Sequence, residues 1–129
     1  MSVARPDRVD APAVPTVVLA NESQFYPTVI DAARLLGWLP AHFRPARTAK
    51  GWRTAVQGDG KGFPDFVLAH AGAGRVWFVE LKLDKAKLTR EQILWGETLV
   101  RAGAVYRTVY CPSGLPMFLQ DLADAVRPL

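Results

Sequence analysis

The sequence is poor in the residues that build disulfides and structural zinc sites. Its 129 residues include one cysteine, Cys111, and two histidines. An intrachain disulfide and a four-ligand zinc site of the usual kind are therefore excluded. A chain without disulfides suits a reducing compartment, so we expect a cytoplasmic protein. Because Cys111 ends a predicted strand, we expect it to be a small core residue rather than a nucleophile.

Long apolar runs are lacking as well. The longest such stretch near the N-terminus covers residues 17–20, after Pro12 and Pro15, and is too short for a signal-peptide core or a membrane span. We therefore expect no membrane contact. Half of the residues are hydrophobic, so the chain can bury a core. Its length suits one domain, which we place at residues 21–129 behind a flexible N-terminal arm of residues 1–20.

Acidic residues are outnumbered, since twelve Asp and Glu face sixteen Lys and Arg and the net charge is +4. A basic protein suits a polyanionic partner, because neutralised phosphates release their counterions. Many soluble proteins are equally basic, so charge alone does not decide the partner.

Apolar spacing and turn residues predict an α/β domain in which helices flank a mixed sheet. The expected elements, in chain order, are a helix from residue 21 or 24 to 36, strands over 38–43, 63–69 and 75–83, a helix over 89–102, a strand over 105–110 and a helix over 115–126. A start at residue 24 would place Pro27 in the tolerated first turn of its helix. Thr89 and Gln92 form a capping-box pattern, and Ser113 is a candidate cap for the last helix.

The strand over 75–83 has the strongest pattern. Its unbroken apolar run, residues 76–79, predicts a strand covered on both faces. Because strand side chains alternate, Glu80 and Lys82 share the face of Val76 and Phe78. A carboxylate and an ammonium group at the end of a buried strand need a partner.

A candidate partner is Asp65, near the start of the preceding strand. If the two strands pair through the glycine-rich turn at 71–74, residue 70 faces residue 75 and Asp65 faces Glu80. Two carboxylates and the main-chain carbonyl of Leu81 are ligands that Mg²⁺ prefers, and Lys82 would serve the attacking water or the phosphate. Either half of this pattern also occurs by chance, as an ion pair or a strand-entry turn.

These motifs resemble the VRR-NUC branch of the PD-(D/E)XK nuclease superfamily. The resemblance covers residues 21–112, and its segments are 62–65 (Gly-Phe-Pro-Asp), 80–82 (Glu-Leu-Lys), 87–92 (Lys-Leu-Thr-Arg-Glu-Gln) and 42–53. It implies a restriction-endonuclease-like αβββαβ core. It also implies a metal-dependent nuclease, with Mg²⁺ or Mn²⁺ on Asp65, Glu80 and Leu81 and with Lys82 serving the catalytic water.

The resemblance further implies that Gln92 and Glu22 are catalytic. Each has a structural alternative, because Gln92 can cap its helix and Glu22 can favour a helix dipole. Relatives of this kind occur in bacteria and phages and act on branched or flapped DNA, the small ones as Holliday-junction resolvases and often as dimers. We therefore expect a homodimer in DNA recombination or repair, without a small-molecule cofactor.

The loop expected over residues 44–62 and the segment after Lys82 are rich in basic residues. The candidate DNA contacts are His42, Arg44, Arg47, Lys50, Arg53, Lys61, Lys85, Lys87 and Arg90. A solvated loop without a ligand remains the alternative for residues 44–53, and His42 could be a satisfied polar group. Three rival functions stay open: a flap nuclease or exonuclease, a DNA-binding module without catalysis, and a ribonuclease.

Overall fold

The computed structural model describes residues 24–43, 46–48, 51–53 and 57–128, with the backbone course alone for 46–48 and 51–53. Its elements are α1 (Phe25–Leu35), β1 (Leu39–His42), β2 (Ala46–Thr48), β3 (Gly51–Arg53), β4 (Phe66–His70), β5 (Arg75–Leu83), α2 (Arg90–Arg101), β6 (Val105–Cys111) and α3 (Leu115–Ala125). The predicted α/β class and the order of the main elements are confirmed.

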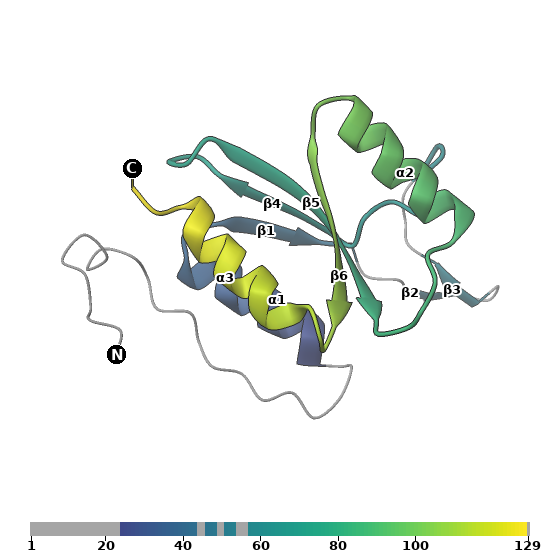
Figure 1. Cartoon of the computed structure of the whole chain (residues 1–129). Helices are drawn as coiled ribbons and strands as arrows, with labels where there is room; N and C mark the ends of the chain where they lie inside the picture. The colour runs from purple at the N-terminus through teal and green to yellow at the C-terminus, as the bar shows by residue number, and fades with distance from the viewer. Residues whose placement is uncertain (1–23, 44–45, 49–50, 54–56, 129) are drawn as a thin grey trace.

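The main sheet has four strands in the order β1-β4-β5-β6. Strands β1, β4 and β5 pair antiparallel, while β6 runs parallel to β5 and is reached through α2. The predicted mixed sheet is therefore confirmed. Helices α1 and α3 lie together on one face of this sheet, and α2 packs against β6 (Figure 1). No helix in the described part of the chain is both long and apolar enough to cross a membrane.

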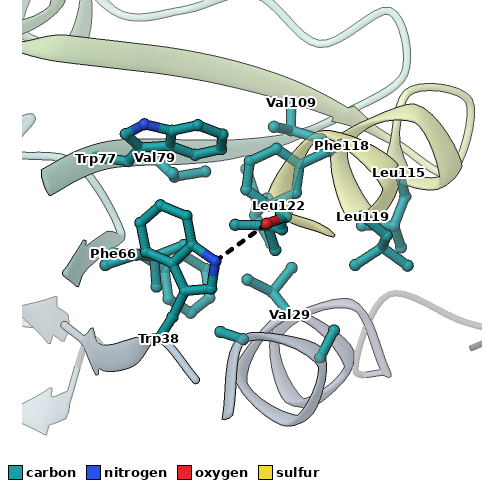
Figure 2. Close-up of a cluster of buried hydrophobic side chains, with 14 of the residues drawn as sticks. Val29, Trp38, Phe66, Trp77, Val79, Val109, Leu115, Phe118, Leu119 and Leu122 are labelled. Carbon is teal, nitrogen blue, oxygen red and sulfur yellow. Dashed lines mark hydrogen bonds between the residues drawn. The ribbon is translucent and has the colours of Figure 1, made fainter. Parts of the chain in front are cut away.

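The hydrophobic core lies between the sheet and the pair α1 and α3 (Figure 2). Trp38 and Trp77 are both buried there, with ring centroids 4.9 Å apart. The indole Nε1 of Trp38 donates a hydrogen bond of 3.2 Å to the carbonyl oxygen of Leu122, so this buried donor is satisfied. Cys111 is also buried, as predicted.

Helix α1 begins at Phe25 with Gln24 as its N-cap, so Pro27 falls in the first turn. The amide groups of a first turn have no partner within the helix, and a proline there removes no hydrogen bond. Of the two predicted starts, the structure shows the later one. The predicted capping box of α2 is confirmed, because Thr89 and Gln92 cap each other reciprocally.

Two local predictions are wrong. The segment 44–62 is not a continuous loop, because β2 and β3 form a two-stranded antiparallel sheet within it. Three residue pairs are too few for apolar alternation to reveal such strands. Ser113 does not cap α3: the N-cap is Gly114, and the Ser113 hydroxyl instead donates to the Asp84 carboxylate at 2.7 Å.

The unbroken apolar run of β5 predicted burial on both faces of the sheet, but the face opposite α1 and α3 is only partly covered. Val76 is half exposed and Phe78 only partly buried, because α2 covers the β6 side of this face. Trp95 is partly buried on α2, where its indole Nε1 donates to the Asp59 carbonyl oxygen at 2.9 Å. It packs edge-on against Phe63, under the loop that leads to β4.

Candidate active site

The pairing of β4 with β5 brings the two predicted carboxylates together. Its register runs from His70 opposite Arg75 to Phe66 opposite Val79. The register predicted through the glycine-rich turn is therefore confirmed. Asp65 lies one residue before β4, and its Oδ2 accepts a hydrogen bond of 2.8 Å from the backbone N–H of Leu81.

The backbone around Asp65 is held from two sides. Its carbonyl oxygen accepts a hydrogen bond of 2.8 Å from the N–H of Phe43, at the end of β1. Gly62, with φ +83°, passes so close to the start of α2 that a Cβ there would lie 2.5 Å from the carbonyl carbon of Glu91. Only glycine fits this conformation and this approach. The segment 62–65 thus ties the first turn of α2 to the β4–β5 edge.

Among the described residues, Glu80 is the only charged side chain that is buried, with 3% of its surface exposed. Its Oε2 accepts a contact of 3.5 Å from Nε2 of Gln92, while Oε1 is buried and has no hydrogen-bond partner among the described residues. Burial and, after it, the neighbouring Asp65 together raise the pKa of Glu80 to about 9, against the opposing charge of Lys82. A carboxylate of this kind stays ionised only when a cation or a donor compensates it.

Lys82 lies two residues beyond Glu80 on the same face of β5, as the alternation predicted. Its position across from Tyr110 of β6 places it at the carboxyl end of both parallel strands. The side chain is partly buried and lines the same pocket as the two carboxylates. The three predicted central residues are thus brought to one place.

The pocket has a volume of about 260 Å³. Its lining residues are Phe25, Tyr26, Asp65, Glu80, Leu81, Lys82, Leu83, Ala86, Gln92 and Cys111. No cluster of three or more His, Cys, Asp or Glu side chains suited to a metal occurs within residues 24–43 and 57–128 or the two short strands between them. The described side-chain ligands of a metal here would be two carboxylates.

Gln92 combines the two roles that the sequence left as alternatives. Its Oε1 accepts a hydrogen bond of 2.9 Å from the N–H of Thr89, and its own N–H donates to the Thr89 hydroxyl at 3.2 Å. Its Nε2 points to Glu80 at 3.5 Å. The start of α2 borders the pocket, so one side chain caps the helix and reaches the site.

Some of the predicted site residues lie outside the described part of the chain: Glu22, predicted to be catalytic, and the predicted DNA contacts Arg44 and Lys50. The predicted DNA contacts Arg47 and Arg53 fall on β2 and β3. Lys85, Lys87 and Arg90 are exposed between β5 and the first residue of α2, beside the pocket-lining Ala86. These placements leave the DNA-binding role of all of them a prediction.

Two predicted contacts have partners inside the protein. The ring of His42 stacks on Tyr26 at 4.7 Å and on Phe66 at 4.5 Å, so it belongs to an aromatic group between α1 and the sheet. Lys61 forms an exposed ion pair of 3.1 Å with Glu91 of α2. Both interactions compete with a direct contact to DNA.

Sequence reasoning did not predict that Phe25 and Tyr26 of α1 line the pocket. Phe25 and Tyr26 line it from the first turn of α1, far from β5 in the chain. The sequence of this helix holds no information on which strand end it meets. Such long-range contacts are fixed only by tertiary packing.

Comparison with known proteins gives one family. The family model described as the VRR-NUC domain matches residues 39–111 of this chain. The match extends from the start of β1 to the end of β6 and includes Asp65, Glu80, Lys82 and Gln92. A search of curated proteins finds no significant match.

Proposed function

The chain belongs to the VRR-NUC family, a nuclease-type family, and from this premise we propose that it is a metal-dependent endonuclease that hydrolyses phosphodiester bonds of branched DNA. The observation that carries the proposal is the pocket in which Asp65, Glu80 and Lys82 meet across β4 and β5. A surface that only binds polyanionic DNA has no use for a buried carboxylate with one oxygen left without a hydrogen-bond partner.

The residues of the pocket fit a divalent cation. The unpartnered Oε1 of Glu80 lies in a pocket that Asp65 also lines, and neither carboxylate has a described cationic partner within ion-pair distance. With the carbonyl oxygen of Leu81 they form an all-oxygen donor set, which suits Mg²⁺ and, as a substitute, Mn²⁺. When bound, such a cation lowers the pKa of a coordinated water and offsets the negative charge that develops on the phosphate.

The protein's own groups have distinct tasks in this proposal. Asp65 is held by the Leu81 N–H and presents its carboxylate in a fixed orientation. Lys82 orients the attacking water, takes its proton or donates to the phosphoryl oxygens. Gln92 donates from its amide into the same pocket. Glu22 is proposed as a further acid of the site.

Branched DNA, a Holliday junction above all, and a homodimer complete the proposal by family analogy. Two active sites in a symmetric dimer suit the two strands that a junction resolvase cuts. The exposed Lys85, Lys87 and Arg90 support the DNA path, because they lie beside the pocket. Flap or exonuclease action shares this chemistry and is separated by the substrate test.

The test is cleavage of labelled four-way junction, flap, single-stranded and duplex DNA and of structured RNA, with Mg²⁺, Mn²⁺ or EDTA. We compare the wild type with Asp65→Asn, which keeps an oxygen for the Leu81 N–H, and with Asp59→Asn, a control on the exposed side of the same loop. We expect metal-dependent, symmetric junction cutting that only Asp65→Asn loses. Binding without cutting of any substrate would contradict the proposal and favour a binding module.

The dimer is tested separately by light scattering after size exclusion, with and without junction DNA. A monomer under both conditions would contradict the dimeric part and leave the chemistry standing. If the protein cuts the flap in preference to the junction, flap DNA becomes the proposed substrate and the proposed active site is unchanged.

A further inference from the structure

We propose that Thr89 is a positioning residue of the active site: the capping box at the start of α2 fixes the carboxamide of Gln92 so that its NH₂ group donates into the pocket. The proposal rests on the proposed nuclease function. It assigns a role to Thr89, which lies outside the pocket itself, and it explains why Gln stands at position 92.

The orientation of the Gln92 amide follows from its two contacts. Its oxygen is held by the N–H of Thr89 at 2.9 Å, so the nitrogen is the end that faces Glu80 at 3.5 Å. The flipped amide would set its NH₂ against the Thr89 N–H and its oxygen against a carboxylate. The first of these contacts would set two donors against each other, so one orientation is selected.

The backbone that carries this amide is held as well. The Gln92 N–H donates to the Thr89 hydroxyl at 3.2 Å, which closes the first turn of α2. Gly62 lies directly against this turn, and the Lys61–Glu91 ion pair of 3.1 Å joins the same two segments. The turn is therefore fixed relative to the segment 62–65, which ends at Asp65.

A capping box accepts Glu as well as Gln at its third position. Glu would also interact favourably with the helix dipole, and Glu91 already supplies an acid to this turn. At position 92, however, Glu would place a further carboxylate against Glu80, beside Asp65. Gln alone supplies an acceptor to the helix end and a donor to the pocket. The choice of Gln over Glu at position 92 therefore reflects the need for a hydrogen-bond donor in the pocket, because the helix end alone would accept either residue.

The donor has a defined effect on Glu80. It holds Oε2, which leaves Oε1 as the buried oxygen without a partner. The contact of 3.5 Å is long, and catalytic hydrogen bonds commonly shorten only in the substrate complex. Loss of the box would free the amide to rotate and would remove this bias between the two carboxylate oxygens.

Four variants test the proposal on the full chain. Thr89→Ala removes the cap hydroxyl, and Thr89→Ser restores it. Gln92→Glu keeps the capping box but loses the NH₂ donor. Glu97→Gly is the matched control, because it weakens the exposed middle of α2 by about 1 kcal/mol, much as loss of an N-cap does.

We expect Thr89→Ala to lower kcat by about tenfold, as loss of a supporting hydrogen bond does elsewhere, with KM for DNA unchanged. Thr89→Ser and Glu97→Gly should stay close to the wild type. Gln92→Glu should lose on the order of a hundredfold in kcat. Equal losses in Thr89→Ala and Glu97→Gly, or full activity of Gln92→Glu, would overturn the proposal.

A second measurement is independent of nuclease activity. In ¹H–¹⁵N spectra of the metal-free protein, the Gln92 NH₂ pair is identified by its disappearance in Gln92→Glu. We expect this pair to be shifted from the solvent-exposed position in the wild type and in Thr89→Ser, and to move to that position in Thr89→Ala. An unchanged pair in Thr89→Ala refutes the positioning role, even if the chain cuts no DNA. The failure of the inference is therefore distinguishable from the failure of the proposed function.

Discussion

Replacing Glu80 by Gln should stabilise the metal-free protein at neutral and alkaline pH. The carboxyl group has a pKa of about 9 in the folded protein, because burial and Asp65 disfavour its charge, against an ordinary value of 4.5. Between these values the unfolded chain releases the proton and the folded chain keeps it. The folded state then binds more protons, so its stability decreases as pH rises from about 4.5 towards about 9.

The slope of this effect is at most about 1.4 kcal/mol per pH unit for one proton. Between pH 5 and pH 8 the wild type should therefore lose about 2–4 kcal/mol. Gln has the shape of the protonated acid and does not titrate. The Glu80→Gln variant should match the wild type within about 1 kcal/mol at pH 5 and exceed it by about 2–4 kcal/mol at pH 8.

The assay is urea denaturation in EDTA at pH 5, 6.5 and 8, followed by the fluorescence of the buried Trp38 and Trp77. Glu97→Gln, an exposed acid on α2, serves as the control and should keep the wild-type slope. Contributions that do not involve residue 80 or 97 are common to all three proteins and cancel in the difference. Parallel pH profiles of the wild type and Glu80→Gln would refute the raised pKa of the buried Glu80.

Three further outcomes are expected. Lys82→Ala should abolish cutting while gel-shift binding of DNA and the circular dichroism spectrum persist. Arg75→Ala, which removes an exposed charge at the opposite end of β5, should keep cutting. Full activity of Lys82→Ala would remove this lysine from the mechanism. Mg²⁺ at a hundred times its Kd should stabilise the wild type by about 2.7 kcal/mol in thermal denaturation, and Asp65→Asn should lose this effect; an equal gain in both would place the cation elsewhere. Gly62→Ala should cost about 2–4 kcal/mol in urea denaturation, because it adds a clash with α2 to the strain of a positive φ, whereas Gly58→Ala meets no neighbour and should cost about 1 kcal/mol; equal costs would contradict the close approach at Gly62.

Local rules were sufficient for the central part of the site. Alternation on β5 placed Glu80 and Lys82 on one face, and the glycine-rich turn set the β4–β5 register that brings Asp65 near them. The Thr89–Gln92 capping box could likewise be predicted from the sequence, since it is formed within one helical turn. Each of these features depends on residues close in the chain or joined by a tight turn, so the sequence alone determines it.

Other properties depend on elements that meet only in the folded protein. Glu80 is buried in a pocket that residues of α1, α2 and β6 also line, and Tyr26 reaches this pocket only because of where α1 packs. The same packing decides that Gln92 acts on both the helix and the pocket, where the sequence allowed either. Burial, and with it the pKa of Glu80, is a sum over neighbours distant in the chain, and no local pattern contains that sum.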